Sequence, residues 1–346
     1  MQMKILMSDR EHSSCQHSFC LICIGCFFCI FFFLLSIFHG SVDIPVRDVL
    51  HILLGDTSAG ESTRFIVLQS RLPQALTALL AGGALSVSGL LLQTAFRNPL
   101  AAPDIFGVTG GASLAVAILM LVPELAVSGI LGYLSSVLAA FIGALAVTAL
   151  IWIFSKRVRS SVLLIIVGIM VSYLCSSVIT LLNASSTEAG VRSFVVWSMG
   201  DFSNVSMDAM PMFASITLLS ILATFFLVKP LNAMLMGPQY AEGLGINVRR
   251  MRNVLLLLTG LLTAVVTAFC GPVSFIALAV PHIARLIART SDHRRLLPAT
   301  ILMGSTVALF CNVITTLPTD GTILPLNAVT PLIGTPVIIY VILQRR

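Results

Sequence analysis

The sequence predicts an all-α membrane protein that crosses the bilayer about ten times. Hydrophobic residues make up 57% of the 346 residues, charged residues make up only 10%, and the mean hydropathy is +1.02. A soluble protein carries roughly 25% charged residues, so this chain has too few of them to cover a surface that faces water. Its apolar residues also run continuously instead of alternating with polar ones, which favours helices over the strands of a membrane barrel.

Ten apolar segments are candidate spans, since one crossing takes about 20 residues. The expected spans are 19–39, 72–92, 106–122, 129–154, 162–182, 210–228, 254–270, 273–289, 297–317 and 328–343. Segment 273–289 fits least well, because Pro281, His282 and Arg285 shorten its apolar part. The sequence shows neither a separate soluble domain nor a clear internal repeat, so we expect residues 1–346 to form a single transmembrane domain.

The basic residues predict how the chain is oriented in the membrane. With ten spans and the N-terminus inside, all but four of the 20 Lys and Arg residues fall on the cytoplasmic side, as the positive-inside rule requires. The four that fall outside are Arg47, Arg64, Arg71 and Arg192. We therefore expect both termini in the cytoplasm. The net charge of +6 reflects this sorting and does not call for a nucleic acid partner.

The stretch "CLICIGCFFC" (20–29) places four cysteines at three-residue intervals, a spacing close to that of iron–sulfur proteins. On a helix each such step rotates by about 300°, so the four thiols drift around the helix and do not converge on one cluster. The bacterial ferredoxin run also has a longer last gap and a following proline, whereas Ile30 follows Cys29 here. We expect no metal site on this chain and interpret the cysteines as apolar residues of the first span.

The first span could also be mistaken for a cleaved signal peptide, because Lys4 and Arg10 precede it. Its apolar run of about 20 residues is longer than a signal core of 7–15 residues. We therefore expect a retained helix.

The spans themselves carry little chemistry. Almost no Asp or Glu lies within them, which argues against a proton relay of buried carboxylates. The chain contains no G-x-x-x-x-G-K-[ST] loop, so it does not bind ATP by that route. The small residues of "AGGALSVSG" (81–89) and "GVTGGAS" (107–113) predict close helix packing.

The longest polar segment is "KPLNAMLMGPQYAEGLGINVRRMRN" (229–253). A connection of this length is usually structured or functional. Its prolines and glycines divide it into short pieces. We expect two short helices on the cytoplasmic side of the membrane, and the alternative is a solvated basic loop.

Four stretches resemble the FecCD-type permeases of bacterial ABC importers for iron–siderophores, haem and cobalamin. They are "RLPQALTALLAGGALSVSGLLLQTAFRNPLAAPDIFGVTGGASLAV" (71–116), "VVWSMGDFSN" (195–204), "LNAMLMGPQYAEGLGINVRR" (231–250) and "GPVSFIALAVPHIARLI" (271–287). They follow the order and spacing of the family motifs, and the resemblance covers roughly residues 40 to 346. It implies the type II ABC importer permease fold.

The resemblance also implies partners. Permeases of this family form a homodimer with the translocation path at its axis, bind two copies of a separate ATPase that holds ATP and Mg, and receive cargo from an extracytoplasmic binding protein. No cofactor is expected on this chain, which is embedded in the cytoplasmic (inner) membrane. The path helices would be about 162–182 and 328–343. The residues expected to couple to the ATPase are Gln239, Ala241, Glu242, Leu244, Gly245 and Ile246.

Four positions depart from the family motifs. Gln74 stands where the family has the second arginine of RLPR, Asn312 and Thr316 stand where Asp and Arg are expected, and Asn327 replaces a glycine. These departures concern the outer rim, where the binding protein docks. Arg71 matches the family pattern, and Arg64 and Arg192 are the other candidates for docking.

The function expected from these observations is that of the membrane permease of an ATP-driven importer for a ferric siderophore, haem or a similar metal chelate. It is not an enzyme, because ATP hydrolysis belongs to the separate ATPase. The alternative is a stand-alone ion-coupled secondary transporter or a channel. The scarcity of acidic residues within the spans and the punctuated 229–253 segment both argue against this alternative.

Overall fold

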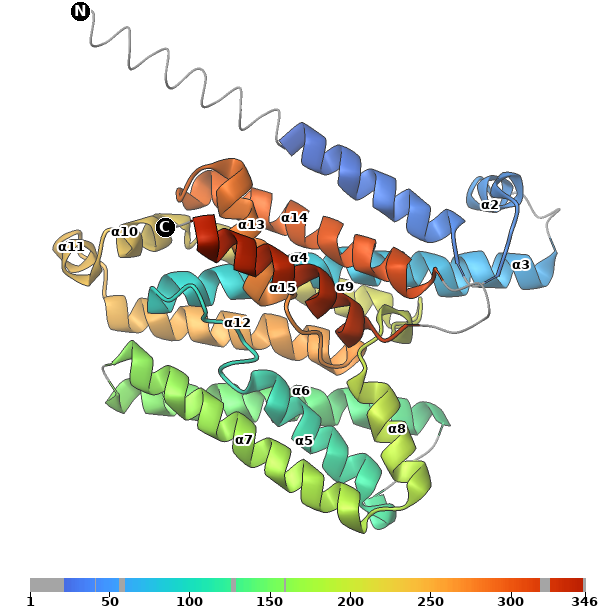
Figure 1. Cartoon of the computed structure of the whole chain (residues 1–346), viewed down its shortest axis with the longest axis horizontal. Helices are drawn as coiled ribbons and strands as arrows, with labels where there is room; N and C mark the ends of the chain where they lie inside the picture. The colour runs from blue at the N-terminus through green and yellow to red at the C-terminus, as the bar shows by residue number, and fades with distance from the viewer. Residues whose placement is uncertain are drawn as a thin grey trace, which may run out of the picture.

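The computed structural model describes residues 22–40, 42–55, 60–125, 129–158, 160–317 and 324–344. Over these residues the regular structure is entirely helical, and most of the long helices run roughly along one direction (Figure 1). The helices α10 (Val228–Leu235) and α11 (Pro238–Gly243) lie at one end of the bundle, which we call the α11 end. The helices α3 (Glu61–Phe65) and α8 (Glu188–Ser198) lie towards the opposite end, which we call the α8 end.

The chain begins with an N-terminal helix, Ile22–Phe38, which carries no label in Figure 1. The later elements are α2 (Val46–Leu53), α3 (Glu61–Phe65), the π-helical η1 (Ile66–Arg71), α4 (Leu72–Phe96), α5 (Val108–Leu121), η2 (Pro123–Leu125), α6 (Gly129–Arg157), α7 (Ser161–Ser185), α8 (Glu188–Ser198), η3 (Phe202–Asn204), α9 (Met210–Phe225), α10 (Val228–Leu235), α11 (Pro238–Gly243), α12 (Val248–Cys270), α13 (Ile276–Ala288), α14 (His293–Thr315) and α15 (Leu326–Gln344).

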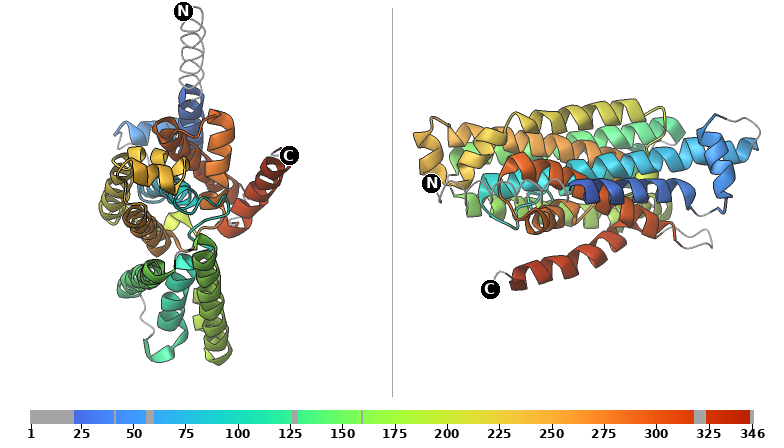
Figure 2. Two further views of the ribbon diagram at one scale, coloured as in Figure 1. Left: turned by 90° about the vertical axis from the view of Figure 1, so that its left-hand side faces the viewer. Right: turned by 90° about the horizontal axis from the view of Figure 1, so that it is seen from above.

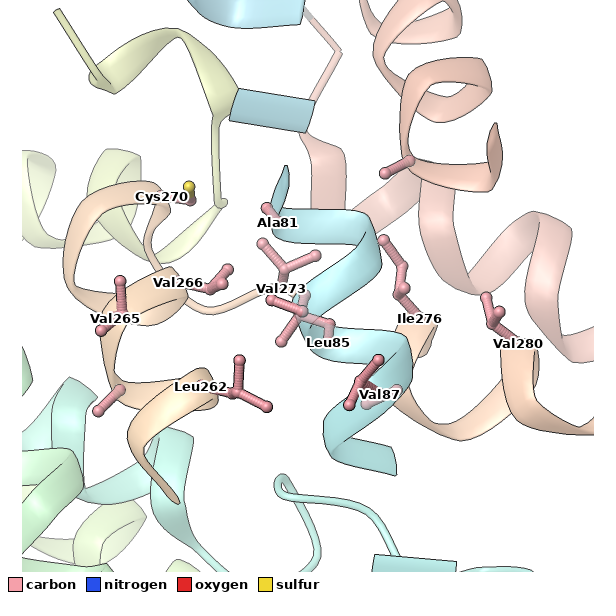
Figure 3. Close-up of a cluster of buried hydrophobic side chains, with 14 of the residues drawn as sticks. Ala81, Leu85, Val87, Leu262, Val265, Val266, Cys270, Val273, Ile276 and Val280 are labelled. Atoms are coloured by element: carbon pink, nitrogen blue, oxygen red, sulfur yellow. The ribbon is translucent and has the colours of Figure 1, made fainter. Parts of the chain in front are cut away.

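The central helix is α4, which packs against α12, α13 and α14. Its residues Leu85 and Val87 point into the cluster of buried side chains that Figure 3 shows between α4, α12 and the segment leading into α13. Small residues permit this close packing. A Cβ atom at Gly82 would overlap the backbone of Gly304 in α14, and one at Gly89 would overlap the carbonyl oxygen of Ala277 in α13. The packing role predicted for the small residues at 81–89 is confirmed.

Ten apolar helices or helix pairs correspond to the ten predicted spans. Among the described residues, five helices are long and apolar enough to cross a membrane, and the pair α9 and α10, bent by 54°, makes a sixth. Four shorter apolar helices complete the set: Ile22–Phe38, Val108–Leu121, Ile276–Ala288 and Leu326–Tyr340. The all-helical membrane fold is therefore confirmed, although several predicted boundaries are wrong.

Two predicted spans are much shorter as helices. α5 has 14 residues and α13 has 13, or roughly 20 Å each, which is less than the hydrocarbon thickness of about 30 Å. Residues 97–107 precede α5 as a loop, and their side chains Ala101 and Phe106 are buried. Non-helical backbone is tolerated at membrane depth when protein surrounds it, so buried loops replace the missing helical turns.

Other predicted spans begin too late. α12 starts at Val248 instead of 254, because the basic turn after the cap Asn247 is already helical. The second span continues back through η1 and α3, so that one helical segment runs from Glu61 to Phe96. Charged and polar residues extend these helices beyond the apolar part on which the predictions were based.

The cysteines of the N-terminal helix face different surroundings. Cys23 and Cys26 are exposed, whereas Cys29 is buried. Cys20 and the start of the predicted first span lie outside the described residues. Within the described chain, no group of three or more His, Cys, Asp or Glu side chains could hold a metal ion.

Candidate functional site: the α11 end and the exposed helix faces

The segment predicted to form two short helices does so, as α10 and α11. α11 ends in a hydrogen-bonded turn of the Schellman type. The amide of Gly245 donates to the carbonyl of Glu242 (2.9 Å), and the amide of Ile246 donates to that of Ala241 (3.0 Å). Gly245 has a φ of +81°, a conformation that favours glycine. Gly245 therefore ends the short helix α11.

This segment is anchored on one side and open on the other. Ala241 is completely buried and Ile246 packs against the core. Leu244 is 59% exposed. The residues predicted to couple to an ATPase thus divide into a buried anchor and an exposed surface, to which Met236 and Tyr240 add large apolar side chains. Gln239, Glu242 and Gly245 are exposed.

A polar cluster ties α10 to the core of the bundle. Asn232 Nδ2 donates to Asp292 Oδ1 (2.5 Å), and Asn232 Oδ1 accepts from the amide of His293 (2.8 Å). His293 Nδ1 also lies 2.8 Å from Asn232 Oδ1, and its Nε2 lies 2.9 Å from Thr94 Oγ1 on α4. Partial burial would raise the pKa of Asp292, but the hydrogen bonds from the Arg294 amide and Asn232 outweigh it and lower that pKa. This cluster was not predicted; the only signal for it in the sequence is an Asp placed to cap α14.

A second cluster joins α4, the loop before α5, and α13. Gln93 Oε1 accepts a hydrogen bond from Arg285 (2.6 Å), while its Nε2 donates to the carbonyl of Leu278 (3.2 Å). His282 Nε2 lies 2.8 Å from the carbonyl oxygen of Pro99. The polar residues that made this span the weakest prediction therefore hold a short helix against its neighbours.

Two helices present largely unpacked faces on one side of the bundle. Only 17% of the apolar stretch of α7 is buried within the protein. Its exposed side chains include Leu, Ile, Met and Tyr residues and the hydroxyls of Ser176, Ser177 and Thr180. α15 stands away from the bundle (Figure 2) and exposes Leu332 and Ile339. α7 and α15 include the segments expected to line the translocation path.

A cavity of about 740 Å³ lies at the α8 end, between α8, α5, α6 and the outer turns of α12 and α14. Tyr133, Trp197 and Phe269 line it together with Asn312 and the first residue of α15. α7 contributes no lining residue, so the cavity is separate from the open face of α7. The helix α8 was not predicted, although Thr187 accepts a hydrogen bond from the amide of Gly190 and so caps its start.

The docking residues expected at this end differ in exposure. Arg64 on α3 and Arg192 on α8 are exposed, but Arg71 is only 4% exposed. Its guanidinium donates to the carbonyls of Ile37 (3.1 Å) and Phe38 (2.9 Å) at the end of the N-terminal helix. A side chain buried in this way is not available to a docking partner, so the docking role expected for Arg71 is replaced by a structural one.

The residues that depart from the family motifs also make hydrogen bonds within the bundle. Gln74 Nε2 donates to Asn312 Oδ1 (3.0 Å) across 238 residues of sequence. The two positions where Arg and Asp were expected therefore hold a neutral hydrogen-bonded pair. Asn327 Nδ2 donates to the carbonyls of Ser198 and Pro272, and Thr316 Oγ1 donates to the carbonyls of Asn312 and Val313 in α14.

Restoring one charge at this pair should cost stability, and restoring both should recover it. We expect Gln74→Arg and Asn312→Asp each to lower the stability of the bundle, because the first places an unpaired charge in a half-buried site and the second places one in a buried site. The double variant should be more stable than the sum of the single effects by about 0.5–3 kcal/mol. Thermal unfolding of the four proteins in one detergent measures this coupling, and strictly additive effects would contradict the contact.

Comparison with known proteins decides the family. The model of the FecCD transport family matches residues 28–344. The chain belongs to the FecCD family. Among its relatives, the FecCD protein is 32% identical over 308 residues to the hemin transport system permease protein HmuU of Yersinia pestis, covering 89% of this chain and 92% of that one. It is 35% identical over 298 residues to the vitamin B12 import system permease protein BtuC of Shigella boydii, covering 85% and 88%.

A solved structure shares the fold of this FecCD protein. It is described as "An inward-facing conformation of a putative metal-chelate type ABC transporter", and it matches with a TM-score of 0.81 and 26% identity over 93% of this chain and 98% of that one. The FecCD protein is thus a multi-pass membrane permease subunit of an ABC importer, whose ATP binds on a separate ATPase. The alternative of a stand-alone transporter or channel is overturned by this membership.

Proposed function

We propose that this permease carries a bulky metal chelate of the ferric siderophore or haem class. The named relatives transport hemin and vitamin B12, both of which are large metal complexes. The exposed faces of α7 and α15 support the proposal, because they offer apolar and hydroxyl groups and present no carboxylate that would bind a bare metal ion. A path of this kind suits a cargo whose metal is already fully coordinated.

A second copy of the chain is the partner that we assign to α7 and α15. Both helices carry rows of exposed Leu, Ile and Tyr side chains, and they lie on the same face of the bundle (Figures 1 and 2). Pairing two such faces would bury these apolar rows around a central path. The separate cavity behind α8 would not be part of that path.

The architecture of α10 and α11 is the observation that supports coupling to an ATPase. Ala241 and Asn232 fix this pair of helices to the bundle, while Leu244 and Tyr240 project from it. A short, rigid helix with an exposed apolar tip fits a groove on a partner. We assign that groove to the ATPase, one copy beneath each permease, and assign residues 229–253 as the coupling segment within the single transmembrane domain.

The orientation follows from the same assignment. The ATPase is cytoplasmic, so the α11 end faces the cytoplasm and the α8 end faces outward, with Arg64 and Arg192 available to a binding protein. As the chain proceeds, the N-terminal helix runs away from the α11 end, whereas α15 runs towards it (Figure 1), which supports two cytoplasmic termini. The protein is then a component of the cytoplasmic membrane.

Transport by the reconstituted complex tests this function. Vesicles containing the permease and its ATPase, supplied with the binding protein, should take up one labelled cargo among ferric siderophore, hemin and cobalamin, and only with ATP. ATP and binding protein should be needed on opposite faces of the bilayer. Uptake driven by an ion gradient without ATP, or with both components on one face, would contradict the proposal.

A further inference from the structure

The helix α2 carries an apolar surface that the bundle does not cover. Four of its side chains, or those directly after it, are large, apolar and exposed: Val46, Leu50, Leu53 and Leu54, the last of them 86% exposed. Their spacing of four, three and one residues places them on one face of a helix. Such a face needs a partner that excludes water.

α2 has three distinct faces. Val49 and Ile52 point inward and are buried, since α2 packs against η1. At 100° per residue, the exposed apolar side chains lie next to this buried face, whereas Arg47, Asp48 and His51 lie on the remaining side. The apolar surface of α2 is thus divided between the protein and a second apolar environment, with polar side chains opposite.

The depth of α2 relative to the membrane identifies that second apolar environment. Arg71, the last residue of η1, binds the carbonyls at the end of the N-terminal helix, so η1 and α2 lie just beyond the end of a membrane-spanning helix. That helix has 17 residues, from Ile22 to Phe38, and is about 26 Å long, close to the hydrocarbon thickness of about 30 Å. α2 therefore lies at the depth of the lipid headgroups.

The direction and the side of α2 agree with this depth. Figure 1 shows α2 nearly end-on while the N-terminal helix and α4 run across the view, so α2 lies roughly parallel to the membrane plane. Figure 2 places it beside the N-terminal helix and away from α15. The N-terminal helix also exposes large apolar side chains, among them Phe27, Phe31 and Leu34.

We infer that α2 is an interfacial anchor that inserts Val46, Leu50, Leu53 and Leu54 at the boundary between lipid headgroups and acyl chains. Helices that lie in the interface bury an apolar face by about 5–10 Å at this boundary. The lipid bilayer is the partner of this surface, and neither the binding protein nor a second permease is. The inference concerns membrane contact alone and holds whatever the cargo is.

Fluorescence quenching in vesicles tests the anchor. A tryptophan is introduced by Leu50→Trp, or by Arg47→Trp on the polar face as the control, after Trp152 and Trp197 have been replaced by Phe. The full-length variants are reconstituted into vesicles of phosphatidylethanolamine and phosphatidylglycerol that contain lipids with a spin label near the headgroup. Leu50→Trp should show blue-shifted emission and quenching by these lipids, whereas Arg47→Trp should be quenched by aqueous acrylamide.

Two outcomes would overturn the inference. One is equal access of acrylamide to both tryptophans with no quenching by lipid. The other is shielding of Leu50→Trp only when the binding protein is added, which would make α2 a docking surface. Leu54→Trp provides an independent position if the first variant is poorly produced.

Discussion

Leu244→Asp should abolish assembly with the ATPase while leaving the permease folded in the membrane. The side chain is 59% exposed at the tip of α11 in this chain, so the substitution is harmless to the bundle itself. In the complex the same position would be an apolar anchor, and truncating such an anchor typically costs 2 kcal/mol or more. We expect the affinity for the ATPase to fall by about 30-fold or more, and transport to be lost.

Binding of the ATPase to the detergent-solubilised permease measures this effect directly. Leu317→Asp is the matched control. Leu317 is also an exposed leucine, but it follows the C-terminus of α14 at the end of the bundle away from α11. It should leave ATPase binding unchanged. Unaltered binding of Leu244→Asp would show that the exposed side of α11 faces solvent in the complex and does not contact the ATPase.

Gly89→Ala should destabilise the whole bundle. A single methyl group at this position would overlap the carbonyl oxygen of Ala277, so α4 and α13 would have to move apart. Overpacking of a closely packed core costs about 1–3 kcal/mol, and we expect the upper part of this range because the obstacle is backbone. A lower unfolding temperature in detergent and a smaller yield of monodisperse protein are the measurements.

Gly110→Ala in α5 is the matched control for this prediction. A Cβ atom at Gly110 would meet its nearest neighbour, Ser172 Cα, at an ordinary contact distance of 3.6 Å. Alanine favours a helix over glycine by up to about 1 kcal/mol, so this variant should be as stable as the parent or more stable. Equal losses in both variants would mean that helix packing at Gly89 is looser than the structure shows.

The sequence predicted what depends on local pattern. Continuous apolar runs located the spans, and the prolines and glycines of 229–253 indicated the two short helices α10 and α11. The small residues of α4 predicted its close packing. Each of these features follows from a few neighbouring residues, which is why one sequence was enough.

Contacts between distant segments could not be predicted in this way. Gln74 and Asn312 each appeared as an isolated departure, and only the fold shows that they bond to one another. Arg71 appeared as a surface residue because its partners are backbone carbonyls of the N-terminal helix, which no side-chain pattern reveals. α8 was missed because its short, mixed sequence has no apolar run, although Thr187 caps it.

The shortness of α5 and α13 has a consequence for biosynthesis. A helix of 13 residues that carries His282 and Arg285 cannot remain in lipid alone, because it is too short to cross the bilayer and its Arg285 charge would face lipid. Gln93, which accepts the hydrogen bond of Arg285, belongs to α4, and α4 leaves the ribosome much earlier. We therefore expect α13 to enter the membrane only against an α4 that is already in place, so that late steps of insertion require part of the tertiary structure to exist beforehand.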